Sequence, residues 1–202
     1  LTSIGNYAFY GSAVRDLGSM ATCSSLTTIG SSAFYGSAIE EVQFPESITS
    51  IGQQAFAGCT GLTELTIPDH MGNGMGSQAF GNCTGLKTVT VPVDYLVHRA
   101  YGYSEDYYSA FNGCSNVETI YYTPGQTGRM LDRQTYDYND NCYRYSLEYA
   151  CRENLRHVFF EEGVTAIGSH AFYCTEGESV LEKVVLPSTL TSIGNYAFYD
   201  TA

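Results

Sequence analysis

The stretch Ile48–Pro68 reads ITSIGQQAFAGCTGLTELTIP, and its pattern recurs along most of the chain. The clearest marker is the dipeptide Ala-Phe, whose phenylalanines are Phe9, Phe34, Phe56, Phe80, Phe111, Phe172 and Phe198. Most of the gaps between them are close to 24 residues, and an Ile-Gly pair precedes the phenylalanine in five of the copies. A fixed period of this length is typical of proteins built from stacked repeat units.

Each unit also contains a run of the form apolar-x-x-apolar-x-apolar-Pro, which predicts a short β-strand because alternate residues share a face and proline removes a ladder donor. The runs are Ile39–Pro45, Leu62–Pro68, Leu86–Pro92, Val117–Pro124, Leu155–Phe160 and Leu181–Pro187, with a degenerate copy at Val14–Leu17. Between Phe111 and Phe172, Glu148 stands at the phenylalanine position of an eighth unit. One unit cannot bury its own apolar side, so we expect the units to stack into a solenoid with a parallel sheet.

The pattern Leu-Thr-x-Ile-Gly-x-x-Ala-Phe-x-Gly-Cys-x-x-Leu-x-x-Val-x-Ile-Pro resembles the BspA-like class of bacterial leucine-rich repeats over nearly the whole chain. The resemblance implies an α/β repeat solenoid, a right-handed curved array with its parallel sheet on the concave face and short helical or irregular segments elsewhere. It also implies a secreted or cell-surface protein with a role in adhesion or host-protein binding. Two insertions depart from the pattern, at about 95–108 and 125–147.

The two ends of the chain carry the same sequence, because Leu1–Tyr10 is identical to Leu190–Tyr199. Neither end shows the polar capping unit that a free solenoid needs. We therefore expect residues 1–202 to form a single solenoid that is a fragment of a longer array. Uncapped ends of this kind also predict self-association.

The charge balance excludes several classes of partner. Nine Lys and Arg stand against 21 Asp and Glu, which gives a net charge of −12. A strongly acidic chain repels nucleic acid and anionic lipid, so we expect it to bind neither. No apolar run approaches the roughly 18 residues of a membrane span, so we also expect no direct membrane insertion.

The cysteines follow the repeat. Five of the seven occupy the same position of the unit, and they are Cys59, Cys83, Cys114, Cys151 and Cys174. We expect them to stack as small buried side chains, with a bridge between Cys142 and Cys151 as the alternative. The spacing of zinc ligands is absent from the sequence, and we expect neither a metal nor a cofactor.

One loop matches the spacing of a calcium site. Asp137, Asn139, Asn141 and Glu148 follow the order of ligands in a calcium-binding loop, but Cys142 replaces the glycine that makes its sharp turn. We favour a solvated loop rich in Asp and Asn over a calcium site.

The strand pattern also predicts which residues point outward on the open face of the sheet. Tyr121, Phe159 and Val185 should lie in one line across adjacent strands, with His157 beside them, and such an apolar strip is typical of an interaction site. Twelve of the eighteen tyrosines lie between positions 95 and 149, among them Tyr103, Tyr107, Tyr138 and Tyr143. These insertions either face a ligand together with the strip or fold over the strip and bury it.

The sequence therefore favours a non-enzymatic cell-surface or secreted module that binds a host or extracellular protein or glycan through the concave sheet and the Tyr-rich insertions. A structural spacer that projects another domain from the cell is the first alternative. An enzyme is the second, although nothing in the spacing of Ser, Cys, His and Asp places a nucleophile beside a base.

Overall fold

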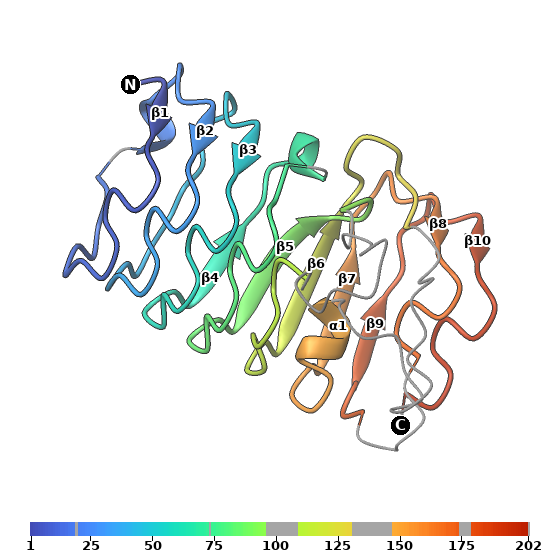
Figure 1. The fold of residues 1–202 in the computed structure, drawn as a ribbon. Helices are drawn as coiled ribbons and strands as arrows, with labels where there is room; N and C mark the ends of the chain where they lie inside the picture. The colour runs from blue at the N-terminus through green and yellow to red at the C-terminus, as the bar shows by residue number, and fades with distance from the viewer. Residues whose placement is uncertain (19, 73, 96–108, 131–146, 174–178, 202) are drawn as a thin grey trace, which may run out of the picture.

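The computed structural model describes residues 1–18, 20–72, 74–95, 109–130, 147–173 and 179–201. Figure 1 shows repeat units that lie side by side in sequence order, with short strands arranged in two columns. Within the described residues the only α-helix is α1 (Leu147–Ala150), and two 3₁₀ turns, η1 (Met20–Thr22) and η2 (Asp69–Met71), complete the helical content. The expectation of short helical segments is therefore confirmed for this part of the chain.

The main sheet has five parallel strands in the order β4-β5-β6-β7-β9. Their bounds are β4 (Glu64–Thr66), β5 (Thr88–Pro92), β6 (Thr119–Thr123), β7 (His157–Phe160) and β9 (Lys183–Val185). Each strand lies within one of the predicted runs, and the apolar residues Leu65, Val89 and Ile120 stand opposite one another as their repeat positions require. Both the parallel sheet and its register are confirmed.

Two of the predicted strands are wrong, because neither Ile39–Pro45 nor Val14–Leu17 contains a strand. Pairing of the first run with β4 in the repeat register would place Glu41 directly beside Glu64, and like charges in that position destabilise a sheet. In the second run the side chain of Asp16 accepts a hydrogen bond from the N–H of Gly18 at 2.6 Å. A local bond of this kind competes with the backbone hydrogen bonds that a strand would make.

A second column of two-residue strands lies at the Ile-Gly pairs, where no strand was predicted. It consists of β1 (Ser3–Ile4), β2 (Thr28–Ile29) and β3 (Ser50–Ile51) in one parallel sheet, and β8 (Ala166–Ile167) and β10 (Ser192–Ile193) in another. The glycine of the pair is needed because neighbouring backbones approach closely here. A Cβ atom on Gly52 would lie 2.6 Å from the backbone nitrogen of Ser31.

The Ala-Phe dipeptides lie in turns that stack on one another. The N–H of Phe34 donates to the carbonyl of Ala55, and the N–H of Phe56 donates to that of Ala79, both at 2.7 Å. The residue two positions before the phenylalanine has a left-handed backbone in six units, at Tyr7, Ser32, Gln54, Gln78, His170 and Tyr196. None of these residues is glycine, so the sequence carried no sign of this conformation.

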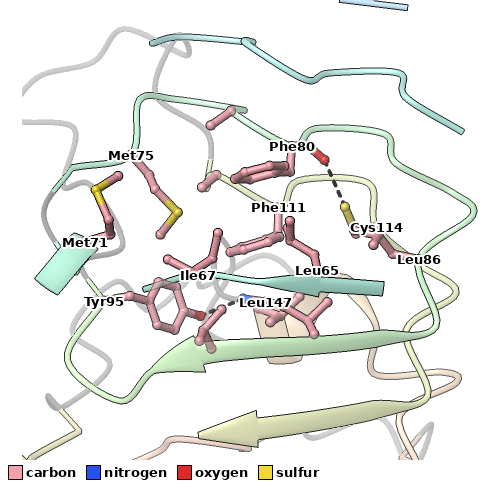
Figure 2. Packing of buried hydrophobic residues seen from close by; sticks show 14 of the residues in the cluster. Leu65, Ile67, Met71, Met75, Phe80, Leu86, Tyr95, Phe111, Cys114 and Leu147 are labelled. Carbon is pink, nitrogen blue, oxygen red and sulfur yellow. Dashed lines mark hydrogen bonds between the residues drawn. The ribbon is translucent and has the colours of Figure 1, made fainter. Parts of the chain in front are cut away.

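The core is a continuous cluster of buried side chains that extends from Ile4 to Ala197. Its phenylalanine rings stack between units, with centroids 4.9 Å apart for Phe34 and Phe56 and 5.5 Å apart for Phe80 and Phe111. Figure 2 shows Phe80 and Phe111 above Leu65 and Ile67, which come from the β4 repeat. Each unit therefore buries its apolar side against its neighbours, as the repeat requires.

Candidate ligand-binding face

The predicted strip lies in register on the open face of the main sheet. Tyr121 of β6 stands opposite Phe159 of β7, which stands opposite Val185 of β9. The rings of Tyr121 and Phe159 are stacked, with centroids 4.8 Å apart and planes inclined by 13°. Both rings are half-buried, whereas Val185 is exposed. The three side chains therefore form a partly accessible apolar surface across three strands.

Two basic groups adjoin this strip. The ammonium of Lys183 lies over the Phe159 ring, 5.3 Å from its centroid, in a cation–π contact. His157 lies one strand position before Val158, and its Nδ1 is 3.5 Å from the hydroxyl oxygen of Thr119. The strip thus combines aromatic surface with a cation and polar hydrogen-bonding groups, a combination that is typical of interaction surfaces.

The open face of the sheet also has a graded charge. Glu64 of β4 is followed in register by Thr88, Thr119, His157 and finally Lys183 of β9. The acidic end and the aromatic, basic end of this face are therefore separated by the width of the sheet. Pairs of opposite charge also join neighbouring units, since Lys87 contacts Glu118 at 2.7 Å and Arg156 contacts Glu182.

A buried polar cluster lies beneath the strip, and the sequence did not predict it. The carboxyl oxygens of Glu148 accept hydrogen bonds from the hydroxyls of Tyr122 and of Tyr95, the latter at 3.3 Å. The Tyr95 hydroxyl also accepts the N–H of Leu147 at 3.1 Å, as Figure 2 shows. All four residues are buried. The only sequence signal for this cluster was the glutamate at a phenylalanine position.

The cysteines of the described residues are free thiols, and four of the five are buried. Cys59, Cys83 and Cys114 each donate to the carbonyl of a phenylalanine in the preceding unit. Cys151 is buried as predicted, but it donates to Leu147 within its own unit at 3.0 Å. Because Cys151 is a free thiol, the alternative of a bridge to Cys142 is not supported. Cys174 lies outside the described residues.

Burial weakens the acidity of these thiols. Desolvation raises the pKa of Cys59 to about 11, and desolvation followed by the nearby Glu148 carboxyl raises the pKa of Cys151. The neighbouring Cys114 thiol and burial together raise the pKa of Cys83 well above its ordinary range. Thiolates are the reactive form of cysteine, so burial disfavours reaction of these side chains in the folded protein.

The remaining predicted site residues lie outside the described part of the chain. These are Tyr103, Tyr107, Tyr138 and Tyr143 of the insertions and Asp137, Asn139 and Asn141 of the calcium-like loop. The two alternatives for the insertions, which are to face a ligand or to cover the strip, stay predictions, as does the calcium alternative. Among the described residues, no group of three or more His, Cys, Asp or Glu side chains is arranged to hold a metal ion. In the part of the chain that the structure describes, no helix is long enough and apolar enough to cross a membrane.

Comparison with known proteins places these features in a family. The family described as "BspA type Leucine rich repeat region" matches residues 1–108 and 130–202, in six copies. A search of curated proteins finds no match.

Several solved structures are similar to the chain. A leucine-rich repeat protein from Bacteroides ovatus is 24% identical, with a TM-score of 0.39, and the match covers 100% of this chain and 56% of that one. The pneumococcal vaccine antigen PcpA is 19% identical, with a TM-score of 0.44 and coverage of 96% and 56%. A leucine-rich cell surface protein from Faecalibacterium prausnitzii is 21% identical, with a TM-score of 0.35 and coverage of 100% and 55%.

This chain thus spans a little over half the length of these three structures. The family match covers most of the chain. The recurring Ile-Gly pairs lie where neighbouring backbones approach closely, and the Ala-Phe dipeptides lie in turns that hydrogen-bond between units. The chain belongs to the BspA-type leucine-rich repeat family.

Proposed function

We propose that this chain is a non-enzymatic binding module of a bacterial cell-surface or secreted protein, and that it recognises a host or extracellular protein or glycan. The binding surface is the open face of β6, β7 and β9, which we take to be the concave face of the array, together with the Tyr-rich insertions. The observation that carries the proposal is the stack of Tyr121 on Phe159 with Lys183 beside it.

Several physical features support this assignment. The rings of Phe34, Phe56 and Phe80 stack within the core, where they stabilise the fold. Exposed tyrosines such as Tyr10 also stack, but they do so in the turns of the Ala-Phe column, whereas Tyr121 and Phe159 stack on the open face of the main sheet and retain partial exposure. Aromatic rings there bury a large area on binding at a small cost in side-chain entropy. A repeat array also presents such a face as an extended surface, and solenoid proteins commonly use that surface to bind their partners.

The experiment is a solid-phase screen of the chain against extracellular-matrix proteins and a glycan array. The wild type is compared with the double variant Tyr121→Ala/Phe159→Ala, after circular dichroism and the urea midpoint have shown unchanged folding. A matched control is Tyr10→Ala/Tyr199→Ala, because both tyrosines are more than half exposed and lie in the turns of the Ala-Phe column. Oligomeric state is measured in parallel, because we also propose that the chain self-associates, and self-association would change the apparent affinity for a partner.

We expect the wild type and the control to bind the same partner, and the double variant to lose at least a factor of about ten in affinity, or about 1.4 kcal/mol. If the wild type binds nothing, or if the double variant binds as well as the control, the strip is not a recognition site.

The second candidate is a structural spacer that projects another domain. The regular stacking of Phe9, Phe34, Phe56 and Phe80, with neighbouring centroids 4.9 to 5.3 Å apart, favours it. A spacer, however, gives no reason for aromatic side chains on the solvent face of the sheet. It becomes the better account if the screen finds no partner.

A further inference from the structure

A groove lies at the end of the main sheet opposite to the aromatic strip. It has a volume of about 570 Å³ and is lined by residues 40–44 and 63–66 together with Glu46 and Pro68. One wall is the segment Ile39–Pro45, which does not form the predicted strand, and the other is β4. Figure 1 shows β4 as the first strand of the five-stranded sheet. Its size lies in the range of ligand-binding pockets, which is roughly 300 to 1,000 Å³.

The wall formed by β4 is an open strand edge. The N–H of Ile67 donates to Thr90 at 2.9 Å, and the carbonyl of Thr63 accepts from Lys87 at 2.8 Å, so these two residues direct their backbone groups toward β5. Alternate residues of a strand point their backbone groups to opposite sides, and Glu64 and Thr66 therefore direct theirs into the groove. Within the described residues, no backbone hydrogen bond joins positions 41–44 to this edge.

The groove is strongly acidic. Glu41, Glu46 and Glu64 are exposed along it, and within the described part of the chain none of the three forms an ion pair. Glu41 only accepts a hydrogen bond from the side chain of Gln43 at 2.6 Å. These carboxylates do not converge on a point where one metal ion could bind, among the residues that the structure describes. Carboxylates that are spread along an extended groove instead suit a ligand that carries several separated positive charges.

The same charges explain why the groove stays open. Closing it would bring Glu41 beside Glu64, and their repulsion opposes the backbone hydrogen bonds that pairing would gain. A positively charged side chain inserted between them would remove the repulsion. Glu41 and Glu64 point to the open face of the sheet, whereas the intervening Val42 and Leu65 are buried. An added strand would therefore need basic side chains on one face and apolar side chains on the other.

From this geometry we propose that the groove binds an extended peptide of alternating basic and apolar residues, which adds as a strand to the edge of β4. The backbone of the peptide hydrogen-bonds with Glu64 and Thr66, its Lys or Arg side chains lie beside Glu41 and Glu64, and its apolar side chains pack near Val42 and Leu65. Main-chain hydrogen bonds supply affinity and alternate side chains supply specificity in this mode of recognition. The net charge of −12 further attracts a basic peptide.

The test uses an acetylated and amidated heptapeptide that alternates lysine and valine, with a fluorescent label and detection by anisotropy. We expect saturable binding of one peptide per chain. Glu41→Gln/Glu64→Gln should weaken binding at least tenfold, whereas Glu153→Gln/Glu161→Gln removes the same charge away from the groove and should leave affinity within about twofold of the wild type. Equal weakening by both variants, or no saturable binding, would overturn the proposal.

A second pair of variants tests strand addition. Thr66→Pro removes the N–H that points into the groove and leaves the ladder with β5 intact, because proline is tolerated where a strand edge faces solvent. We expect it to abolish binding, whereas Thr66→Ala retains the N–H and the affinity. Equal affinity of the two variants contradicts strand addition.

Three further peptides need no protein variant and keep the test valid if Thr66→Pro fails to fold. Two carry N-methyl groups at alternate residues, one on its lysines and the other on its valines, so that each blocks the hydrogen bonds along one edge of the strand. The third has the same composition with all lysines grouped at one end. The regrouped peptide and one of the two N-methylated peptides should bind at least tenfold more weakly than the alternating peptide. Equal binding of the regrouped peptide would show general charge attraction only, and equal binding of the two N-methylated peptides would exclude strand addition.

Discussion

The thiol of Cys83 donates a hydrogen bond to the carbonyl oxygen of Phe56, with 3.1 Å between sulfur and oxygen. Cys59 makes the same bond to Phe34 at 3.1 Å, and Cys114 makes it to Phe80 at 3.0 Å. Each thiol thus reaches the phenylalanine of the preceding unit. These three cysteines join units to one another by buried hydrogen bonds, as well as filling space in the core.

The first prediction concerns this contact. Cys83→Ala removes the bond to Phe56 and leaves a small cavity, so we expect the free energy of unfolding to fall by about 1–3 kcal/mol. Cys23→Ala is the control, because Cys23 is only half-buried, and it should cost under about 0.5 kcal/mol. Urea denaturation followed by circular dichroism measures both values. Equal losses of unfolding free energy in the two variants would show that the hydrogen bond from Cys83 to Phe56 does not stabilise the fold.

The second prediction concerns alkaline pH. Desolvation raises the pKa of Cys59 from an ordinary 9.0 to about 11, so the folded state keeps a proton that the unfolded state releases above pH 9. The contribution of this thiol is fully present below pH 9 and is lost as pH rises to 11, with a slope of about 1.4 kcal/mol per pH unit.

Urea titrations of the wild type and of Cys59→Ala at pH 8, 9 and 10 measure that contribution. The stability advantage of the wild type over the variant should shrink from pH 9 to pH 10. An advantage that is constant over this interval would mean that the thiol has the same pKa in both states.

The third prediction concerns the close approach of neighbouring backbones. In Gly52→Ala the new Cβ would meet backbone atoms of Ser31 and Gly30 at 2.6 and 2.7 Å, and backbone cannot yield as a flexible side chain would. We expect a loss of about 1–3 kcal/mol in the free energy of unfolding. Gly5 occupies the same position of its unit with nothing within 4 Å, so Gly5→Ala should be neutral. Urea midpoints of the two variants that agree with each other would contradict this account of the Ile-Gly pair.

The fourth prediction concerns the buried carboxyl group. Tyr122→Phe removes one donor to Glu148, and Glu148→Gln replaces one of the acceptor oxygens with an amide. Because the two groups are in direct contact, their effects on stability should be coupled by about 1–2 kcal/mol in a double-mutant cycle. Additive effects would show that the two side chains do not depend on each other in the folded protein.

The sequence predicted those parts of the fold that depend on period and alternation. The register of Tyr121 on Phe159 followed from counting alone, because a strand has period two and every unit carries its strand at the same position. The same counting failed at Ile39–Pro45, whose apolar pattern matches that of Leu62–Pro68. The repeat register places Glu41 opposite Glu64, but the apolar pattern alone did not weigh the repulsion between two like charges that opposes this pairing.

Contacts between distant residues were also beyond the sequence. Tyr95 and Glu148 are 53 residues apart and meet across the two insertions, so no local pattern connects them. The left-handed turn residue was hidden for another reason. Gln54 and Gln78 adopt positive φ values of 55° and 53° because the stacked turns impose them, and a glutamine does not signal that conformation.

The central claim, that the strip of Tyr121 and Phe159 binds the partner, is tested most directly by hydroxyl-radical footprinting with mass spectrometry. The chain is oxidised alone and in complex with the partner found in the screen, and modification is measured at Tyr121, Phe159, Tyr10 and Tyr199. The account predicts protection of Tyr121 and Phe159 in the complex and unchanged oxidation of Tyr10 and Tyr199. Protection of Tyr10 and Tyr199 with Tyr121 and Phe159 unchanged would contradict it.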